Sequence, residues 1–182
     1  MLKHTSIKQL AFCSICIALA TVTSFIKLTS LPFGGSITLF SMLFITLTGY
    51  FFGVKAGIAT GITYGILSFL LEPYMLTPVQ LLLDYPLAFG ALGLSGVFSN
   101  KKYGLITGYI VGVLGRYLFH VISGYVFFAS YAPEGTNTLI YTLLYNLTYI
   151  LPEMIATIVL LCIPAIRKLL LRLKDDTKKQ VS

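Results

Sequence analysis

GLITGYIVGVLGRYLFHVISGYVFF, residues 104–128, is the stretch that decides the fold of this chain. It contains no Asp, Glu or Lys, and its two basic side chains are those of Arg116 and His120. A helix needs about 20 largely apolar residues to cross the hydrocarbon core of a bilayer. The stretch therefore predicts a transmembrane helix that carries two ionisable side chains within the membrane.

The composition of the whole chain agrees with this interpretation. The 182 residues are 57% hydrophobic and 10% charged, with a mean hydropathy of +0.88, whereas a soluble domain carries about 25% charged residues. A water-soluble fold of this size could not cover so much apolar surface, which argues against a cytosolic enzyme. An intrinsically disordered chain is excluded, because disorder requires low hydrophobicity and many charges.

Breaks rich in glycine, proline or charge divide the chain into six apolar segments, and we expect an all-α integral membrane protein. The length allows a single transmembrane domain covering residues 1–182, built as a bundle of six helices with short loops. The expected spans are 7–27, 37–52, 55–71, 76–97, 104–128 and 138–166. The short alternating segments of a transmembrane barrel are not seen.

Basic residues predict the orientation of these spans. If the N-terminus is cytoplasmic, 11 of the 13 lysines and arginines fall on the cytoplasmic side, Lys27 falls outside and Arg116 lies within a span. This bias places both termini in the cytoplasm and accounts for the net charge of +7 without a nucleic-acid partner. We expect the basic tail, 167–179, to meet anionic lipid headgroups.

Ionisable side chains within a membrane cost about 2.5–3.5 kcal/mol each on insertion scales. Asp84, His120 and Asn146 each lie eight residues from the outer end of their span, which is about 12 Å of helix rise. We therefore expect a carboxylate, an imidazole and a carboxamide from three helices to meet at one depth. Gln80 shares a helix face with Asp84.

Charge counting predicts the kind of ligand. If Asp84 and Glu153 are both ionised and His120 is neutral, the two negative charges and the positive charge of Arg116 leave a net charge of −1. A small aromatic monocation would balance this charge, and tyrosine and phenylalanine rings are available for cation–π contacts. Two alternatives stay open for Glu153, which follows Pro152: it is protonated, or it satisfies backbone groups freed by the proline. For aromatics at helix ends, an interfacial belt is an equal alternative to a binding role.

Small residues indicate close helix packing. Gly53, Gly57, Gly61 and Gly65 recur every four residues, and Gly108 and Gly112 repeat the spacing. Such stripes let helix backbones approach in lipid, either inside the bundle or against a second membrane protein. Cys13 and Cys16 lie within an apolar run, where we expect them to pack as small apolar side chains.

Several stretches resemble the thiamine-specific S component, the substrate-binding membrane subunit, of energy-coupling-factor (ECF) transporters, and the likeness covers nearly the whole chain. The stretches are PFGGS (32–36), QLLLDY (80–85), RYLFH (116–120) with Ser123-Gly124, Tyr131-Ala132, and YTLLYN (141–146) with Pro152-Glu153.

The resemblance implies a six-helix bundle in a prokaryotic plasma membrane, with a high-affinity thiamine pocket near the outer face. Asp84 takes the position of an acidic residue, often Glu in the family, that binds the aminopyrimidine. The chain has no tryptophan, so Phe33 or Phe128 would replace the stacking tryptophan of related pockets. The ligand-binding residues implied are Phe33, Tyr74, Asp84, Tyr85, Arg116, His120, Gly124, Phe128, Tyr141 and Asn146.

The resemblance also implies protein partners. Ser14 and Ala18 match a small-xxx-small motif on the first helix that contacts a transmembrane coupling subunit, and that subunit and two ATPases would supply the energy. The chain itself contains no P-loop, zinc-binding HExxH or GxSxG motif, so we expect no catalysis, cofactor or metal. The loop 28–36 would be the lid over the pocket, with Gly34-Gly35 as its hinge.

Other functions remain open at this point. The chain could be an S component for a thiamine precursor or another vitamin such as riboflavin. A small membrane enzyme using Asp84, His120 and Glu153 as acid–base or metal groups is a candidate from a different class. A structural subunit is a third, although it leaves the intramembrane charges unexplained.

Overall fold

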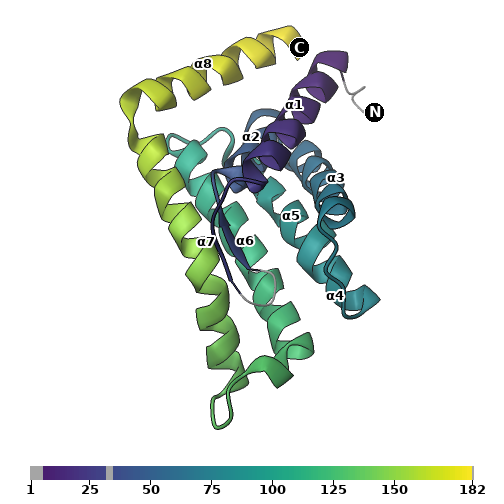
Figure 1. The fold of residues 1–182 in the computed structure, drawn as a ribbon. Coiled ribbons are helices and arrows are strands. Elements are labelled where there is room, and N and C mark those ends of the chain that lie inside the picture. Colours follow the sequence, from purple (N-terminus) through teal and green to yellow (C-terminus); the bar gives the residue numbers. More distant parts are fainter. Residues whose placement is uncertain (1–5, 32–34, 182) are drawn as a thin grey trace.

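The structure, a computed structural model, describes residues 6–31 and 35–181 and is mostly helical (Figure 1). The long helices are α1 (Ile7–Ser24), α3 (Val54–Leu71), α6 (Gly104–Phe127), α7 (Thr138–Cys162) and α8 (Pro164–Val181). Ser6 caps α1 by accepting a hydrogen bond from the Gln9 N–H, and Asn137 caps α7 in the same way through the Leu139 and Ile140 N–H groups. These caps are typical of helix starts.

Within the described residues, five helical segments are long and apolar enough to cross a membrane. They are α1, α3, the segment Pro78–Phe98, α6 and α7. The expected second span forms α2 (Ser41–Phe52), an apolar helix of 12 residues that is nearly all buried. A helix this short rises about 18 Å, less than the hydrocarbon thickness of a bilayer.

The fourth expected span is helical but irregular. It consists of α4 (Pro78–Leu82), a π-helical turn (Leu83–Leu87), α5 (Ala88–Ala91) and a 3₁₀ segment (Leu92–Phe98). Pro86 lies inside the π-helical turn and has no N–H to continue a regular ladder. Asp84 and Tyr85 belong to this turn, and π-helical turns occur frequently at functional sites.

Glycines bring the irregular fourth span into backbone contact with its neighbours. A Cβ on Gly61 would meet the Phe89 carbonyl, and one on Gly57 would lie 2.8 Å from the Gly93 Cα. On α6, a Cβ on Gly108 would lie 2.7 Å from the Ser95 carbonyl oxygen. The glycine stripes therefore pack inside the bundle, where side chains would hold the helices apart.

Two expectations for helices are wrong in detail. The segment between α1 and α2 forms an antiparallel hairpin of β1 (Lys27–Ser30) and β2 (Ser36–Thr38), so the described chain is not entirely α-helical. The sixth span, expected to run through 138–166, ends at Cys162. Ile163 is extended (φ −66°, ψ 119°) because the residue before a proline is disfavoured in the α region, and α8 then turns away across the end of the bundle (Figure 1).

Candidate functional site

A cavity of about 430 Å³ lies inside the bundle, beneath the β1–β2 hairpin and between the α3–α4 connection, α6 and α7. Nine residues expected to bind a ligand line it: Tyr74, Asp84, Tyr85, Arg116, His120, Gly124, Phe128, Tyr141 and Asn146. Phe33, and with it the hinge residue Gly34, lies outside the described residues. The structure thus brings residues from four separated segments of sequence to one hollow.

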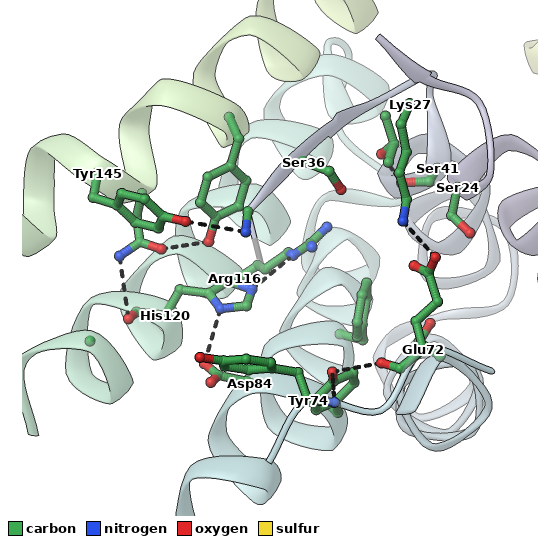
Figure 2. Close-up of a pocket in the computed structure, with 18 of the residues that line it drawn as sticks. Ser24, Lys27, Ser36, Ser41, Glu72, Tyr74, Asp84, Arg116, His120 and Tyr145 are labelled. Carbon is green, nitrogen blue, oxygen red and sulfur yellow. Dashed lines mark hydrogen bonds and ion pairs between the residues drawn. The ribbon is translucent and has the colours of Figure 1, made fainter. Parts of the chain in front are cut away.

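Asp84 is the centre of a hydrogen-bond network in this cavity (Figure 2). Its Oδ2 accepts from Gln80 Nε2 at 2.5 Å and from Ser123 Oγ at 2.9 Å, and its Oδ1 lies 3.1 Å from His120 Nδ1. The Asp84 side chain is 14% exposed. Burial of a carboxylate is tolerated when several donors satisfy it, as they do here.

The contacts of His120 decide which of its nitrogens carries the proton. Arg116 Nε donates to His120 Nε2 at 3.2 Å, so Nε2 is an acceptor and the proton of a neutral ring sits on Nδ1, from which it is donated to Asp84. The Arg116 guanidinium stacks on the Phe89 ring at 4.3 Å from its centroid. Arg116 therefore orients His120 and is not paired directly with Asp84.

The side-chain amide of Asn146 on α7 forms hydrogen bonds to both α6 and α7, and both of its N–H groups are used. Its Nδ2 donates to the Thr142 carbonyl at 2.9 Å and to the His120 carbonyl at 3.4 Å, and its Oδ1 accepts from Tyr149 Oη at 2.5 Å. The amide thus positions His120 and Tyr149 at the cavity wall.

Aromatic rings form much of the remaining wall. Tyr74 and Phe128 stack with centroids 6.1 Å apart and an interplanar angle of 17°. Tyr141 and Tyr145 stack at 6.0 Å, and Tyr145 meets Tyr149 edge-on at 5.9 Å. These rings contact one another and line the cavity together. Such pairs favour a flat or cationic ligand.

The hairpin covers one side of the cavity through contacts at both of its ends. Lys27 Nζ pairs with Glu72 Oε1 at 2.5 Å, at the end of α3, and the Gly35 N–H donates to Tyr145 Oη on α7 at 3.2 Å (Figure 2). A Cβ on Gly35 would lie 2.9 Å from both Tyr145 and Tyr149. The hairpin is therefore held against α7 by close backbone approach and against α3 by a half-exposed ion pair.

Glu153 does not line the cavity. Its carboxylate accepts hydrogen bonds from the Met42 N–H, Ser41 Oγ and Thr38 Oγ1 at 3.1, 3.1 and 2.7 Å. It thus caps the start of α2, where Phe40 has a left-handed φ of 61° and provides no side-chain cap. The alternative that Glu153 satisfies backbone groups freed by Pro152 is wrong, because the backbone N–H that it satisfies belongs to Met42 of α2 rather than to the proline turn of α7.

The charge count predicted from sequence changes accordingly. Glu153 no longer counts among the charged groups of the cavity. Lys27 and Glu72 do line the cavity, and they pair with each other. In the described part of the chain, the Asp84 carboxylate is met by Gln80, Ser123 and a neutral His120 rather than by a lysine or arginine. Its negative charge is therefore left without a direct cationic partner.

Sequence reasoning missed several lining residues. Tyr145 and Tyr149 continue the i, i+4 spacing of Tyr141, and that spacing could have identified them. Ser36, Lys27 and Glu72 come together through the hairpin, for which the sequence has no clear signal. Ser14 and Ala18 are exposed on α1 and do not line the cavity.

Among the described residues, the cavity combines a carboxylate that has no lysine or arginine partner with stacked rings, and it is held within helices of membrane-crossing length. These features define a multi-pass membrane protein that binds a small molecule. The family model described as "Thiamine transporter protein" matches residues 10–172, and the chain belongs to this family. Its members are transporters rather than enzymes.

Individual relatives agree. The chain is similar to the thiamine transporter ThiT of Bacillus subtilis, at 41% identity over 148 residues, which are 74% of this chain and 77% of that protein. It is also similar to ThiT of Lacticaseibacillus paracasei, at 35% identity over 103 residues, covering 47% and 51% of the two chains. A solved structure of ThiT from Listeria monocytogenes superposes with a TM-score of 0.68 and 29% identity, covering 87% of this chain and 96% of that one.

Proposed function

We propose that this chain is the thiamine-specific S component of an ECF transporter: it binds thiamine from outside the cell with high affinity, and separate subunits supply the energy. The observation that carries this proposal is the Asp84 carboxylate, which has no lysine or arginine partner among the described residues and lies in an aromatic-walled cavity. Thiamine is an organic cation with an aminopyrimidine and a thiazolium ring, and both its charge and its two flat rings have counterparts there.

The proposed binding mode assigns a role to each part of the site. Asp84 accepts hydrogen bonds from the aminopyrimidine, oriented by Gln80 and His120. Tyr74, Phe128 and Tyr141 contact ring faces, with Phe128 in the place of a tryptophan. Arg116 and Asn146 hold His120, and Gly124 allows α6 to pack closely against α7, since a Cβ there would collide with the Thr142 methyl group.

The same proposal includes the topology and the partners. The short helix α2 completes a six-helix bundle that forms one domain, both termini are cytoplasmic, and Ser14 and Ala18 on the exposed side of α1 meet the coupling subunit. The β1–β2 hairpin is the lid. Small residues on an exposed helix face permit the close backbone contact that such an interface needs.

Titration of the purified chain with thiamine tests the function. Because the cavity walls are rich in tyrosine, we expect thiamine to quench tyrosine fluorescence with sub-micromolar affinity. Riboflavin and the aminopyrimidine precursor should compete weakly, since neither presents both rings and the cationic charge. Tight riboflavin binding with no response to thiamine would overturn the proposed specificity.

A further inference from the structure

Helix α8 and the connection before α6 form a surface at the end of the bundle opposite the α6–α7 connection (Figure 1). The connection, residues 99–103, lies beneath α8. Lys174 of α8 donates to the Ser99 carbonyl, and its ammonium group sits 3.6 Å from the centroid of the Tyr50 ring. Lys174 is 6% exposed. Since a lysine is rarely so buried without such partners, these contacts fix α8 against the bundle.

Basic groups gather where α8 begins. Arg167 lies 5.7 Å and Lys102 5.4 Å from the centroid of the Tyr103 ring, which is 55% exposed. One turn apart on the outer side of α8, Lys168 and Arg172 are both exposed. Within the described residues neither of these two forms an ion pair. The first half of α8 therefore presents positive charge beside an exposed aromatic ring.

Apolar side chains flank this charge. Leu169 and Leu173, also one turn apart, are 53% and 40% exposed, and Ile163 at the α7–α8 junction is 45% exposed. Exposed leucines next to a basic stripe are typical of a helix that lies in a membrane interface, with its apolar side towards acyl chains and its basic side towards phosphates. Asp175 and Asp176, which would repel phosphate, follow the basic side chains of the first half of α8.

We propose that α8 and residues 99–103 bind the headgroups of anionic phospholipids in the adjacent leaflet, through Lys102, Arg167, Lys168 and Arg172, with Leu169 and Leu173 inserted at the acyl boundary. Charge complementarity favours phospholipid as the occupant, and the surface is continuous with the end of the membrane-crossing helix α7. The proposal requires a membrane protein but not thiamine binding, so failure of one leaves the other intact.

The experiment uses the full-length chain in uncharged detergent micelles and follows thermal unfolding by far-UV circular dichroism. Phosphatidylglycerol should raise the unfolding midpoint in a saturable manner, whereas phosphatidylcholine should not. K168Q/R172Q should weaken the apparent affinity for phosphatidylglycerol about thirtyfold, because each basic side chain near an anionic surface contributes about 1 kcal/mol. K168Q alone should weaken it about fivefold.

The matched control is K55Q, which removes one exposed lysine from the start of α3, outside α8 and residues 99–103. It should leave the lipid response unchanged. Equal stabilisation by phosphatidylcholine, an equal loss of affinity in K55Q, or an unchanged response in K168Q/R172Q would each overturn the proposal. A midpoint shift reproduced by inorganic phosphate would also overturn it, by showing a site for the free anion. An unfolding midpoint equal to that of the wild type in the absence of lipid establishes that each variant is folded.

Discussion

At the scale of single residues, Asp84 has the most exacting surroundings in the cavity. Three side chains donate to it or lie within donating distance, yet its charge has no lysine or arginine partner in the described chain. This arrangement keeps the carboxylate oriented and leaves its charge for a cationic ligand. A hydrogen bond to a charged group contributes about 1.5–3 kcal/mol, so loss of this charge should weaken ligand binding measurably.

We therefore expect Asp84→Asn to weaken thiamine binding about 10- to 150-fold, as the loss of one charge-assisted hydrogen bond implies. Isothermal titration calorimetry of the purified variant measures the change. Asp175→Asn, which removes an exposed carboxylate on α8, serves as the control and should bind as the wild type does. Wild-type affinity in Asp84→Asn would contradict the assigned role.

Glu153 illustrates a buried carboxyl group with a structural role. Glu153→Ala would leave the Met42 N–H and two hydroxyl groups at the start of α2 without their acceptor. We expect it to lower the stability of the fold by about 1–3 kcal/mol, seen as a lower unfolding midpoint in micelles. Glu153→Gln keeps one acceptor oxygen and should lose less. Equal midpoints for the alanine variant and the wild type would show that the cap is dispensable.

At the scale of elements, the bundle depends on backbone contact between α3 and the irregular fourth span. A Cβ on Gly61 would meet backbone atoms of Phe89 and Gly90, which cannot move independently, whereas a Cβ on Gly90 would meet the flexible side chain of Ile62 at 3.2 Å. Gly61→Ala should therefore cost about 1–3 kcal/mol.

Gly90→Ala is the matched comparison, and it should change stability little, because alanine also favours helix over glycine by about 0.5–1 kcal/mol. Unfolding midpoints of the two variants give the comparison directly. A similar loss in both would mean that helix spacing here is not set by backbone contact.

The hairpin is a second element whose attachments differ in strength. The Lys27–Glu72 pair is partly exposed, at 32% and 52% for the two side chains, and exposed pairs contribute about 0.2–1 kcal/mol. We expect Lys27→Glu to accelerate thiamine dissociation about 1.5- to 5-fold, measured by stopped-flow quenching. The charge swap Lys27→Glu/Glu72→Lys should restore the wild-type rate, and failure to restore it would assign the effect to something other than the pair.

At the scale of the whole molecule, the sequence was informative where composition alone decides structure. The apolar stretch 104–128 becomes α6, Gly104–Phe127, because a single continuous apolar segment satisfies its own backbone in lipid only as a helix. The β1–β2 hairpin was not foreseen, since KLTS and SIT are too short for a strand pattern to emerge and their pairing depends on contacts with Glu72 and Tyr145. The break at Ile163 follows from Pro164, whose effect was outweighed by the apolar run around it.

The residues of the site, too, could be predicted from the sequence only in part. Asp84, His120 and Asn146 were recognisable because a polar residue within a span needs an interior partner. The Gln80–Asp84 hydrogen bond follows the i, i+4 spacing noted in the sequence. The position of Glu153 could not be predicted in this way, because helix rotation directs it to α2 instead of the cavity. The π-helical turn at Leu83–Leu87 changes that rotation locally, and no spacing argument based on a regular helix anticipates it.

Orientation in the membrane gives the last prediction. If basic residues set the topology, residues 99–103 and α8 are cytoplasmic, and the α6–α7 connection faces outward with the cavity. In a variant with Cys13, Cys16 and Cys162 replaced by alanine, a single cysteine at exposed Thr136 should react with a membrane-impermeant maleimide on intact cells. A single cysteine at exposed Asn100 should react only after the membrane is permeabilised. The reverse pattern would place the proposed ligand entrance on the cytoplasmic side, and uptake from outside by this pocket would then be untenable.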